Sequence, residues 1–559
     1  MAAGLVLRLG RETAMFASTR AVAMSAGGTL IAGLVASLAF AEDAVVSRKC
    51  FETPYVKGKA ELIITATNGN HRQLPRVLGE AKLNCVAQLQ EDGACLVQVA
   101  PPPGRSIDTI AEQLRLNIFA LKGGTAPKAA QDAIGKVIVN ADLEDPDTNS
   151  IADVKPLPIA AATEQDPRLV DQVELSALDA ESAWFGAQDS NVVTAIIDTG
   201  VKMDHEDLVG QFVGGITIGC LSKTCDGTPD LTSINKHHGT RVAGIIAARK
   251  FNPYGGAGVA WNTKFISVNY GPRVDQYRMA CALQYAIEAG ASIVNASWTG
   301  GYMAGQYSRY PWELFERYAR LAERKGILIV LAAGNDGANL DAQRWYPLDF
   351  RLPNMLGVMA YNVSEDFVPV GNYGRNTIQI AAPDYAAVTT CIESTSCYIR
   401  TQAWGSSWST AYVSGAAALL KSHYPDTDYD FLKWRIMANA TPDERLSDMN
   451  QTGGRLNLVG TIFPVVSQYR DLSRTHESPI NWKTGIRADM CSMVSIEARP
   501  IRAVIAGAYV TVVSATPNDG IERLLPSSFA DIEEDRVQIR VQCLGASPGA
   551  ESLPLKLSP

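Results

Sequence analysis

Four polar side chains stand where apolar segments of the chain begin or end. Asp198 closes an apolar run, Asn335 follows another, and His238 and the Gly-Ser-Ser of residues 405–407 each open a small-residue, helix-like stretch. A serine hydroxyl becomes a nucleophile when an imidazole takes its proton and a carboxylate orients that imidazole. An asparagine amide can stabilise the oxyanion that forms next. Together these residue types predict acyl-transfer chemistry.

Each residue also has an ordinary structural interpretation. Asp198 before Thr-Gly, and Asn335 after Gly, are typical of turns. A single histidine such as His238 is more often structural than catalytic. Both Ser406 and Ser407 suit a helix N-cap, so the local stretch does not choose between them.

The elements that must position these residues lie between 166 and 463. The expected strands are NVVTAIID (191–198), KFISVNY (264–270), ASIVNASW (291–298), GILIVLAA (326–333), LGVMAYNV (356–363) and TIQIAAP (377–383). The expected helices lie at 238–250, 275–290, 311–326 and 409–424. Apolar strands alternating with helices predict an α/β fold, a doubly wound and mainly parallel sheet with helices on both faces. Ligands bind beyond the carboxyl ends of such strands.

The motifs, in their order, resemble those of the subtilisin-like serine proteases. Asp-Thr-Gly stands at 198–200, His-Gly-Thr at 238–240, Ala-Gly-Asn at 333–335 and Gly-Ser-Ser-Trp-Ser-Thr-Ala at 405–411. The resemblance covers roughly residues 166–463. It implies a secreted serine endopeptidase, a hydrolase that needs no cofactor for its chemistry and acts on polypeptide substrates.

The resemblance assigns a role to each polar residue. Ser407 is the nucleophile, His238 the general base and Asp198 the residue that orients the histidine. Asn335 and the backbone N–H of Ser407 form the oxyanion hole. Ser406 takes the place of the family's threonine.

Three positions depart from the family pattern. Trp408 and Ser409 replace smaller or more apolar residues, and Ala411 replaces a proline that fixes the first helical turn. An inactive protease-fold protein that binds peptides or partners therefore stays as the alternative. An esterase or lipase fits the same three residue types but not the motifs.

The resemblance also places the substrate as an extended strand beside two segments. The implied substrate-binding residues are Ser297, Trp298, Thr299, Gly300, Ala332, Ala333 and Gly334. Trp298 suits either a subsite wall or the core. No acidic pair demands a basic substrate residue, which favours a broad or apolar preference.

Asp207 matches a ligand of the structural calcium that family members often bind. The loop at 249–259, which supplies other ligands in the family, is poor in carboxylates, whereas calcium takes six to eight oxygens. The alternative for Asp207 is a solvated loop residue.

Residues 1–41 combine early arginines with an apolar stretch that ends Ala39-Phe40-Ala41, which predicts a signal peptide and secretion. A membrane anchor at 21–41 is the alternative, and no stable membrane span is expected in the mature chain. Residues 42–165, with strands expected at 60–67 and 94–100 and a helix expected at 106–121, resemble an inhibitory propeptide with a linker. Residues 464–559 form a β-rich region.

The net charge limits the kinds of partner that we expect, and the cysteine content indicates the cellular compartment. The formal net charge is −8, which disfavours a nucleic-acid partner. Ten cysteines fit an exported protein. Spacing suggests the pairs Cys220–Cys225, Cys391–Cys397, Cys85–Cys95 and Cys491–Cys543, with Cys50 left over and Cys281 a buried thiol.

Overall fold

The computed structural model describes four strands near the N-terminus and most of the chain from residue 166. The described residues are 60–66, 85–88, 95–99, 134–139, 166–218, 227, 237–271, 275–299, 312–363, 368–401, 405–467, 471–482, 491–502, 505–518, 520–544, 550–552 and 555–558. The leader, the linker, Cys50, Cys220, Cys225 and Gly300 lie outside them. No helix within the described ranges is long and apolar enough to span a membrane.

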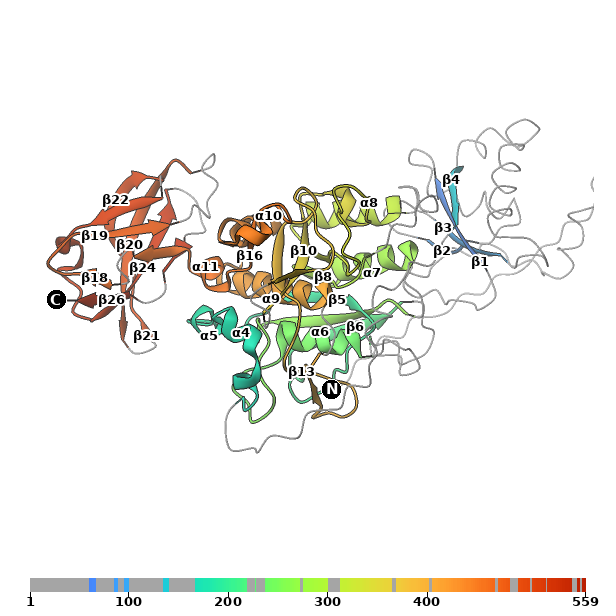
Figure 1. Cartoon of the computed structure of the whole chain (residues 1–559), viewed down its shortest axis with the longest axis horizontal. Helices are drawn as coiled ribbons and strands as arrows, with labels where there is room; N and C mark the ends of the chain where they lie inside the picture. Colours follow the sequence, from blue (N-terminus) through green and yellow to red (C-terminus); the bar gives the residue numbers. More distant parts are fainter. Residues whose placement is uncertain are drawn as a thin grey trace, which may run out of the picture. The chain divides into compact units, whose positions relative to one another are not determined.

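A ten-stranded sheet forms the centre of the region from 166 to 463 (Figure 1). Its spatial order is β15-β16-β12-β10-β9-β8-β5-β7-β6, with β11 beside β10. The strands are β5 (Val193–Asp198), β6 (Phe212–Thr217), β7 (Lys264–Asn269), β8 (Ile293–Ala296), β9 (Leu328–Ala332), β10 (Met355–Asn362), β11 (Val368–Val370), β12 (Ile380–Pro383), β15 (Thr441–Pro442) and β16 (Gly454–Arg455). All pairs are parallel except β10–β11 and β15–β16. The predicted α/β class and the six predicted strands are confirmed.

The strand order changes direction at β5. In the sheet, β5 lies between β7 and β8. After β5 the chain forms the edge strand β6, then β7 beside β5, and then continues on the other side of β5 with β8. In the register of β5 and β7, Asp198 stands opposite Asn269, at the carboxyl ends of both strands. Such a switch point is where α/β sheets place their ligands, so the fold puts Asp198 there.

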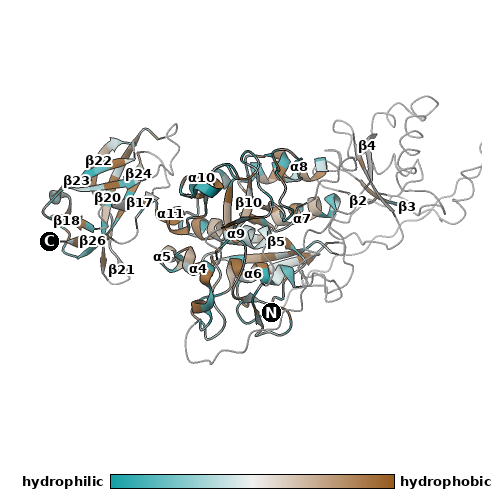
Figure 2. Cartoon of the chain, viewed as in Figure 1, coloured by the Kyte–Doolittle hydropathy of each residue, from teal (hydrophilic) through white to brown (hydrophobic). Residues whose placement is uncertain are grey.

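Helices cover both faces of this sheet. One apolar core lies under α7 (Gln276–Glu288) and α8 (Glu313–Arg324), and a second lies under α6 (His238–Ala247), α9 (Ser406–His423), α10 (Tyr429–Ala438) and α11 (Leu458–Ile462). Alternate residues of β5 enter the two cores: Ala195 and Ile197 the first, Ile196 the second. The short helices α4 (Val173–Ala177) and α5 (Ala180–Ala183) join the second. Figure 2 shows the contrast between hydrophobic β10 and hydrophilic α10.

The N-terminal strands form a separate antiparallel sheet of order β2-β3-β1-β4. They are β1 (Ala60–Ala66), β2 (Cys85–Gln88), β3 (Cys95–Val99) and β4 (Ile134–Val139). The sequence predicted β1 and β3, and the helix expected at 106–121 lies outside the described residues. A disulfide joins Cys85 to Cys95, as the spacing suggested.

The C-terminal region is rich in strands, as expected. A three-stranded sheet has the order β17-β19-β23, and a seven-stranded sheet has the order β18-β26-β24-β20-β21 with β22 beside β20 and β25 beside β24. The strands are β17 (Val465–Ser467), β18 (Asp471–Ser473), β19 (Ser478–Trp482), β20 (Met493–Arg502), β21 (Ile505–Ala506), β22 (Val510–Pro517), β23 (Ile521–Leu524), β24 (Arg536–Cys543), β25 (Ala550–Glu551) and β26 (Leu555–Ser558). The predicted disulfides Cys491–Cys543 and Cys391–Cys397 are present, and Cys281 is buried in α7.

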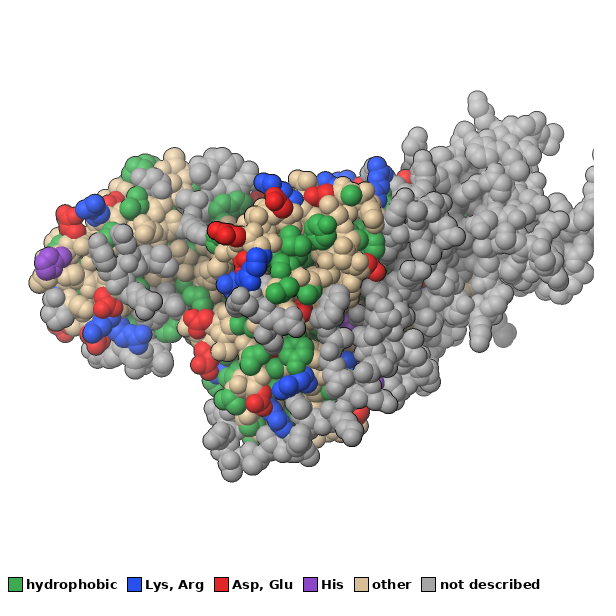
Figure 3. Space-filling model, viewed as in Figure 1, with side chains coloured by type: hydrophobic (Ala, Val, Ile, Leu, Met, Phe, Trp, Pro, Cys, Tyr) green, Lys and Arg blue, Asp and Glu red, His purple; other side chains and the backbone are tan. Residues whose placement is uncertain are grey.

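Acidic and basic side chains are interspersed on the face drawn in Figure 3. No large area of the coloured residues on that face carries charge of one sign.

Candidate active site

Asp198 and His238 form a buried pair. Asp198 is the last residue of β5, and His238 is the first residue of α6. The imidazole Nδ1 lies 2.8 and 2.9 Å from the two carboxylate oxygens of Asp198, whose side chain is almost fully buried. The Thr199 N–H also donates to this carboxylate at 2.7 Å. Because Nδ1 faces a carboxylate, it carries the ring proton in the neutral tautomer, and Nε2 is the basic nitrogen.

The residues next to this pair interlock. Gly239 N–H donates to Thr199 Oγ1 at 3.0 Å. A Cβ at Gly239 would stand 2.5 Å from the Gly200 carbonyl oxygen, so only glycine permits this approach. The two glycine-containing motifs therefore do more than make turns, because they bring the end of β5 against the start of α6.

Ser407 lies in the first turn of α9 and is buried. Its Oγ donates to the Ser297 carbonyl at 3.0 Å, and Ser297 Oγ donates back to the Ser407 carbonyl at 2.9 Å. The indole of Trp408 packs on the His238 imidazole, with ring centroids 5.0 Å apart. The starts of α6 and α9 are therefore neighbours, and the structure brings residues 198, 238 and 407 into one corner.

A chain of buried hydrogen bonds lies beneath Ser407. Ser414 Oγ donates to Asn295 Oδ1 at 2.9 Å, and Asn295 Nδ2 donates to Ser297 Oγ at 3.0 Å. All these side chains are buried. Sequence reasoning missed Asn295 and Ser414. The available signal was that Ser414 follows Ser407 by seven residues, two helical turns, which puts both on one face of α9.

Asn335 and Ser406 form a second hydrogen-bonded group. Asn335 Oδ1 accepts the N–H of Ser406 at 2.9 Å and its hydroxyl at 3.2 Å. Ser406 Oγ accepts the Gly334 N–H at 2.9 Å. With its oxygen so occupied, the Asn335 side chain can offer its NH₂ group to another acceptor. The Ser406 hydroxyl bonds to Gly334 and Asn335, whereas the Ser407 hydroxyl bonds to the Ser297 carbonyl.

The six expected substrate-binding residues that the structure describes are buried. Ser297, Trp298 and Thr299 directly follow β8, and Ala332, Ala333 and Gly334 end and follow β9. Trp298 Nε1 donates to the Ile197 carbonyl at 3.0 Å, and its ring packs edge-on against Phe315. The tryptophan side chain is thus part of the core rather than a subsite wall. Any substrate contact in these segments has to come mainly from main-chain atoms.

Asp207 lies apart from this corner and is buried. Its Oδ1 accepts Asn252 Nδ2 at 2.8 Å, and the nearby Tyr398 hydroxyl donates to Glu206 at 2.9 Å. Burial raises the pKa of Asp207 to about 7.

The two amide side chains considered for a calcium site at Asp207 are engaged in hydrogen bonds within the chain. Asn252 turns its NH₂ group toward Asp207, and its Oδ1 accepts the Tyr254 N–H. The Gln172 amide is bound to main-chain groups of Ala257 and Val388. Within the described part of the chain, no three metal-ligating side chains converge at Asp207. Calcium takes six to eight oxygens, main-chain and amide carbonyls among them, so the Asp207 carboxylate by itself does not make a calcium site.

Comparisons with known proteins agree with this architecture. A family model described as the subtilase family matches residues 189–460. Thermitase from Thermoactinomyces vulgaris is 30% identical over 253 residues, which cover 44% of this chain and 80% of thermitase. The chain belongs to the subtilase family. The extracellular halolysin-like serine protease Nep from Natrialba magadii is 27% identical over 349 residues, covering 59% of this subtilase and 58% of Nep.

A solved structure shows the same fold. The crystal structure of fervidolysin from Fervidobacterium pennivorans aligns with a TM-score of 0.52 and 18% identity, covering 89% of this subtilase and 74% of fervidolysin. This subtilase spans 65% or less of the length of three other curated relatives that it matches.

Proposed function

We propose that this subtilase is a serine endopeptidase with Asp198, His238 and Ser407 as its catalytic residues. The observation that carries the proposal is the place of His238. Its Nδ1 is bound by the Asp198 carboxylate, and its ring lies against Trp408, the residue that follows Ser407. An imidazole oriented by a carboxylate beside a serine is the arrangement that activates a hydroxyl for attack.

The reaction requires the Ser407 hydroxyl to turn from the Ser297 carbonyl, its partner in this structure, toward His238 Nε2. His238 Nε2 takes the Ser407 hydroxyl proton as Oγ attacks the peptide carbonyl carbon. The Asn335 amide and the Ser407 N–H hold the resulting oxyanion. The imidazolium then gives its proton to the leaving amine, which departs and leaves an acyl-serine. Water, deprotonated by His238, hydrolyses that ester and restores the serine. No cofactor enters any step.

We also propose that the chain is secreted as a zymogen. The arginine-containing apolar leader at 1–41 supports export, and the relative Nep is extracellular by name. Residues 42–165 would act as the chain's own inhibitor. Polypeptide substrates would pair with the main chain beside 297–299 and 332–334, with a broad or apolar preference.

Hydrolysis of an unfolded protein substrate tests the peptidase. Purified mature protein should release new amino termini from a denatured, dye-labelled protein, and the Ser407→Ala variant should not. Internal cleavage sites identified by mass spectrometry would establish an endopeptidase. A mature wild-type protein that binds the denatured substrate without cutting it would instead support the inactive, peptide-binding alternative.

A further inference from the structure

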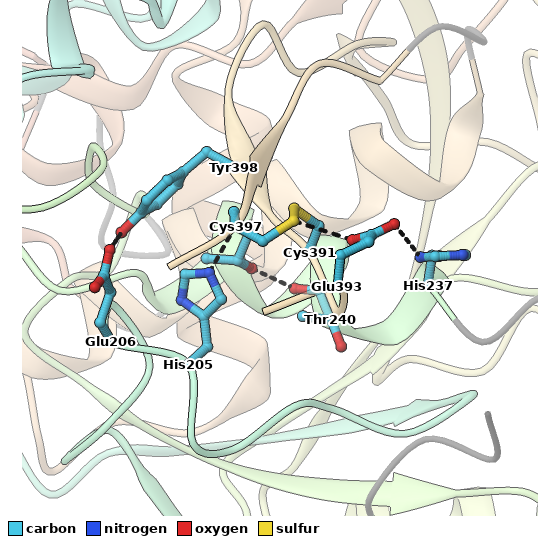
Figure 4. Close-up of a disulfide and its surroundings, with 9 residues drawn as sticks. His205, Glu206, His237, Thr240, Cys391, Glu393, Cys397 and Tyr398 are labelled. Atoms are coloured by element: carbon cyan, nitrogen blue, oxygen red, sulfur yellow. Dashed lines mark hydrogen bonds and ion pairs between the residues drawn. A yellow bond between two sulfur atoms is a disulfide. The ribbon is translucent and has the colours of Figure 1, made fainter. Parts of the chain in front are cut away.

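A small hairpin packs against the helix that carries the proposed general base. It consists of β13 (Thr389–Thr390), β14 (Tyr398–Ile399) and the loop between them, which the Cys391–Cys397 disulfide closes. We call residues 389–399 the cystine hairpin. Figure 4 shows the disulfide between the side chains of Tyr398 and His237.

Two threonines of the cystine hairpin bind the first turn of α6. Thr390 Oγ1 donates to the Thr240 carbonyl at 2.7 Å, and Thr389 Oγ1 donates to the Arg241 carbonyl at 2.7 Å. The contact is close, since a Cβ at Gly244 would lie 2.4 and 2.5 Å from the two threonine hydroxyls. The acceptors stand two and three residues after His238, so the position of the hairpin bears directly on the imidazole.

Glu393 extends this contact to the residue before His238. One Glu393 oxygen lies 3.3 Å from His237 Nδ1, and the other lies 3.0 Å from the sulfur of Cys397 (Figure 4). The His237 and Glu393 side chains are partly exposed, so their contact alone contributes little stability. The disulfide holds Glu393 in place, because it closes a loop of only a few residues around that glutamate.

The other side of the cystine hairpin binds the segment that follows β5. The His205 ring is buried, and its Nδ1 accepts the Asp207 N–H at 3.2 Å. Its Nε2 is therefore the protonated nitrogen, and it donates to the Cys397 carbonyl at 2.7 Å. The Tyr398 hydroxyl donates to Glu206 at 2.9 Å. The hairpin thus contacts both chain segments that leave the Asp198–His238 pair.

We propose that the cystine hairpin is a positioning element for His238 and that its disulfide maintains catalytic turnover. Glu393 is a positioning residue, which acts through His237 and touches no reacting atom. A small dithiol that gave two electrons and two protons to the Cys391–Cys397 bond would leave two thiols and a cyclic disulfide. The loop around Glu393 would then relax, and kcat would fall. This inference rests on the proposed peptidase function.

A pair of double variants tests it. Cys391→Ser/Cys397→Ser should lower kcat by about tenfold or more, since small misplacements of a catalytic group cost up to about 10²-fold. KM should stay within about twofold of the wild-type value, because the substrate-pairing segments belong to other strands. The matched control, Cys491→Ser/Cys543→Ser, opens a disulfide in the C-terminal sheets and should keep the wild-type kcat. Equal kcat in wild type and the first variant, or equal loss in both variants, would overturn the inference.

If the Cys391→Ser/Cys397→Ser variant fails to fold, the Glu393→Gln variant tests whether the cystine hairpin positions His238. It keeps the shape of a partly exposed side chain and removes the charge that faces His237. A severalfold fall in kcat with unchanged KM, restored in part by Glu393→Asp, supports the positioning role. An unchanged kcat contradicts it. Wild-type turnover is measured first, so an inert wild type refutes the proposed function, whereas an active wild type with unaffected variants refutes only this inference.

Discussion

Helices α6 and α9 each deliver one reacting side chain from the first turn, yet they are held in different ways. The long helix α9 is buried along most of its length and is bound from below by the Ser414–Asn295–Ser297 chain. The shorter α6 is likewise buried along most of its length, and the cystine hairpin also binds it from the side. Both reacting side chains therefore depend on the core, and the base depends in addition on a hairpin whose Glu393 is partly exposed. Damage at α9 should cost both stability and rate, and damage at Glu393 mainly rate.

The largest effect is expected at the two serines that open α9. Ser407→Ala should lower kcat by about 10⁶, because loss of a triad nucleophile leaves only binding and oxyanion stabilisation. Ser406→Ala should cost about tenfold, the scale of one hydrogen bond, because its hydroxyl only aligns Asn335 and Gly334. Steady-state kinetics on a peptide substrate measures both. The reverse ranking would mean that Ser406 is the nucleophile.

Asn335 should rank next. Asn335→Ala removes the proposed oxyanion donor and should lower kcat about 10²–10³-fold with little change in KM. The neighbouring exposed residue supplies a control, and Asp336→Ala should leave kcat unchanged. Equal kinetics of the two variants would remove Asn335 from the proposed mechanism.

The buried chain under α9 should show the coupling of rate to stability. Asn295→Ala leaves the buried Ser414 and Ser297 hydroxyls without this partner and should cost about 1–3 kcal/mol of unfolding free energy. A fall in kcat of about tenfold should accompany it through the displaced Ser407. Denaturant unfolding and kinetics on the same sample check both. A lower kcat at wild-type stability would erase the contrast with the cystine hairpin.

The smallest effect is expected at Asp207, beside the hairpin, and concerns stability alone. Its folded pKa of about 7 lies above the unfolded value of about 3.9, so the folded state binds a proton more tightly. The stability from this group is present below about pH 4 and is lost as pH rises through 7. The Asp207→Asn variant should therefore have a higher Tm than wild type at pH 8, by about 2–4 °C for each kcal/mol of added unfolding free energy. The difference in Tm should be smaller at pH 5.

Calcium binding at Asp207 would give the opposite change in the Tm of the Asp207→Asn variant. If Asp207 were a calcium ligand, Asp207→Asn would melt lower than wild type at pH 8 in calcium, and a chelator would abolish the difference. Thermal unfolding with and without calcium, at both pH values, separates the two cases.

Local sequence predicted the sheet because its strands are continuous apolar runs that need both faces covered. It missed β6, whose Phe-Val-Gly-Gly-Ile-Thr sequence contains two glycines and is largely half-exposed. It also missed the strands of the cystine hairpin, each two residues long, since contacts with α6 rather than propensity define them. Elements that depend on distant contacts leave little local signal.

The same limit applies at the site. The motifs predicted Asp198, His238 and Ser407 because the required residue types lie at the ends of recognisable elements. They could not predict the bond between Ser414 and Asn295, which are 119 residues apart. Nor could they choose between core and subsite for Trp298, which the hydrogen bond to Ile197 places in the core.

Covalent labelling with a fluorophosphonate probe tests the central claim most directly. The mature wild-type protein should form one adduct, and peptide mass spectrometry should locate it on Ser407. Ser406→Ala should still be labelled at Ser407, and Ser407→Ala should not be labelled. A folded wild-type protein that resists the probe, or an adduct on Ser406, would contradict the account.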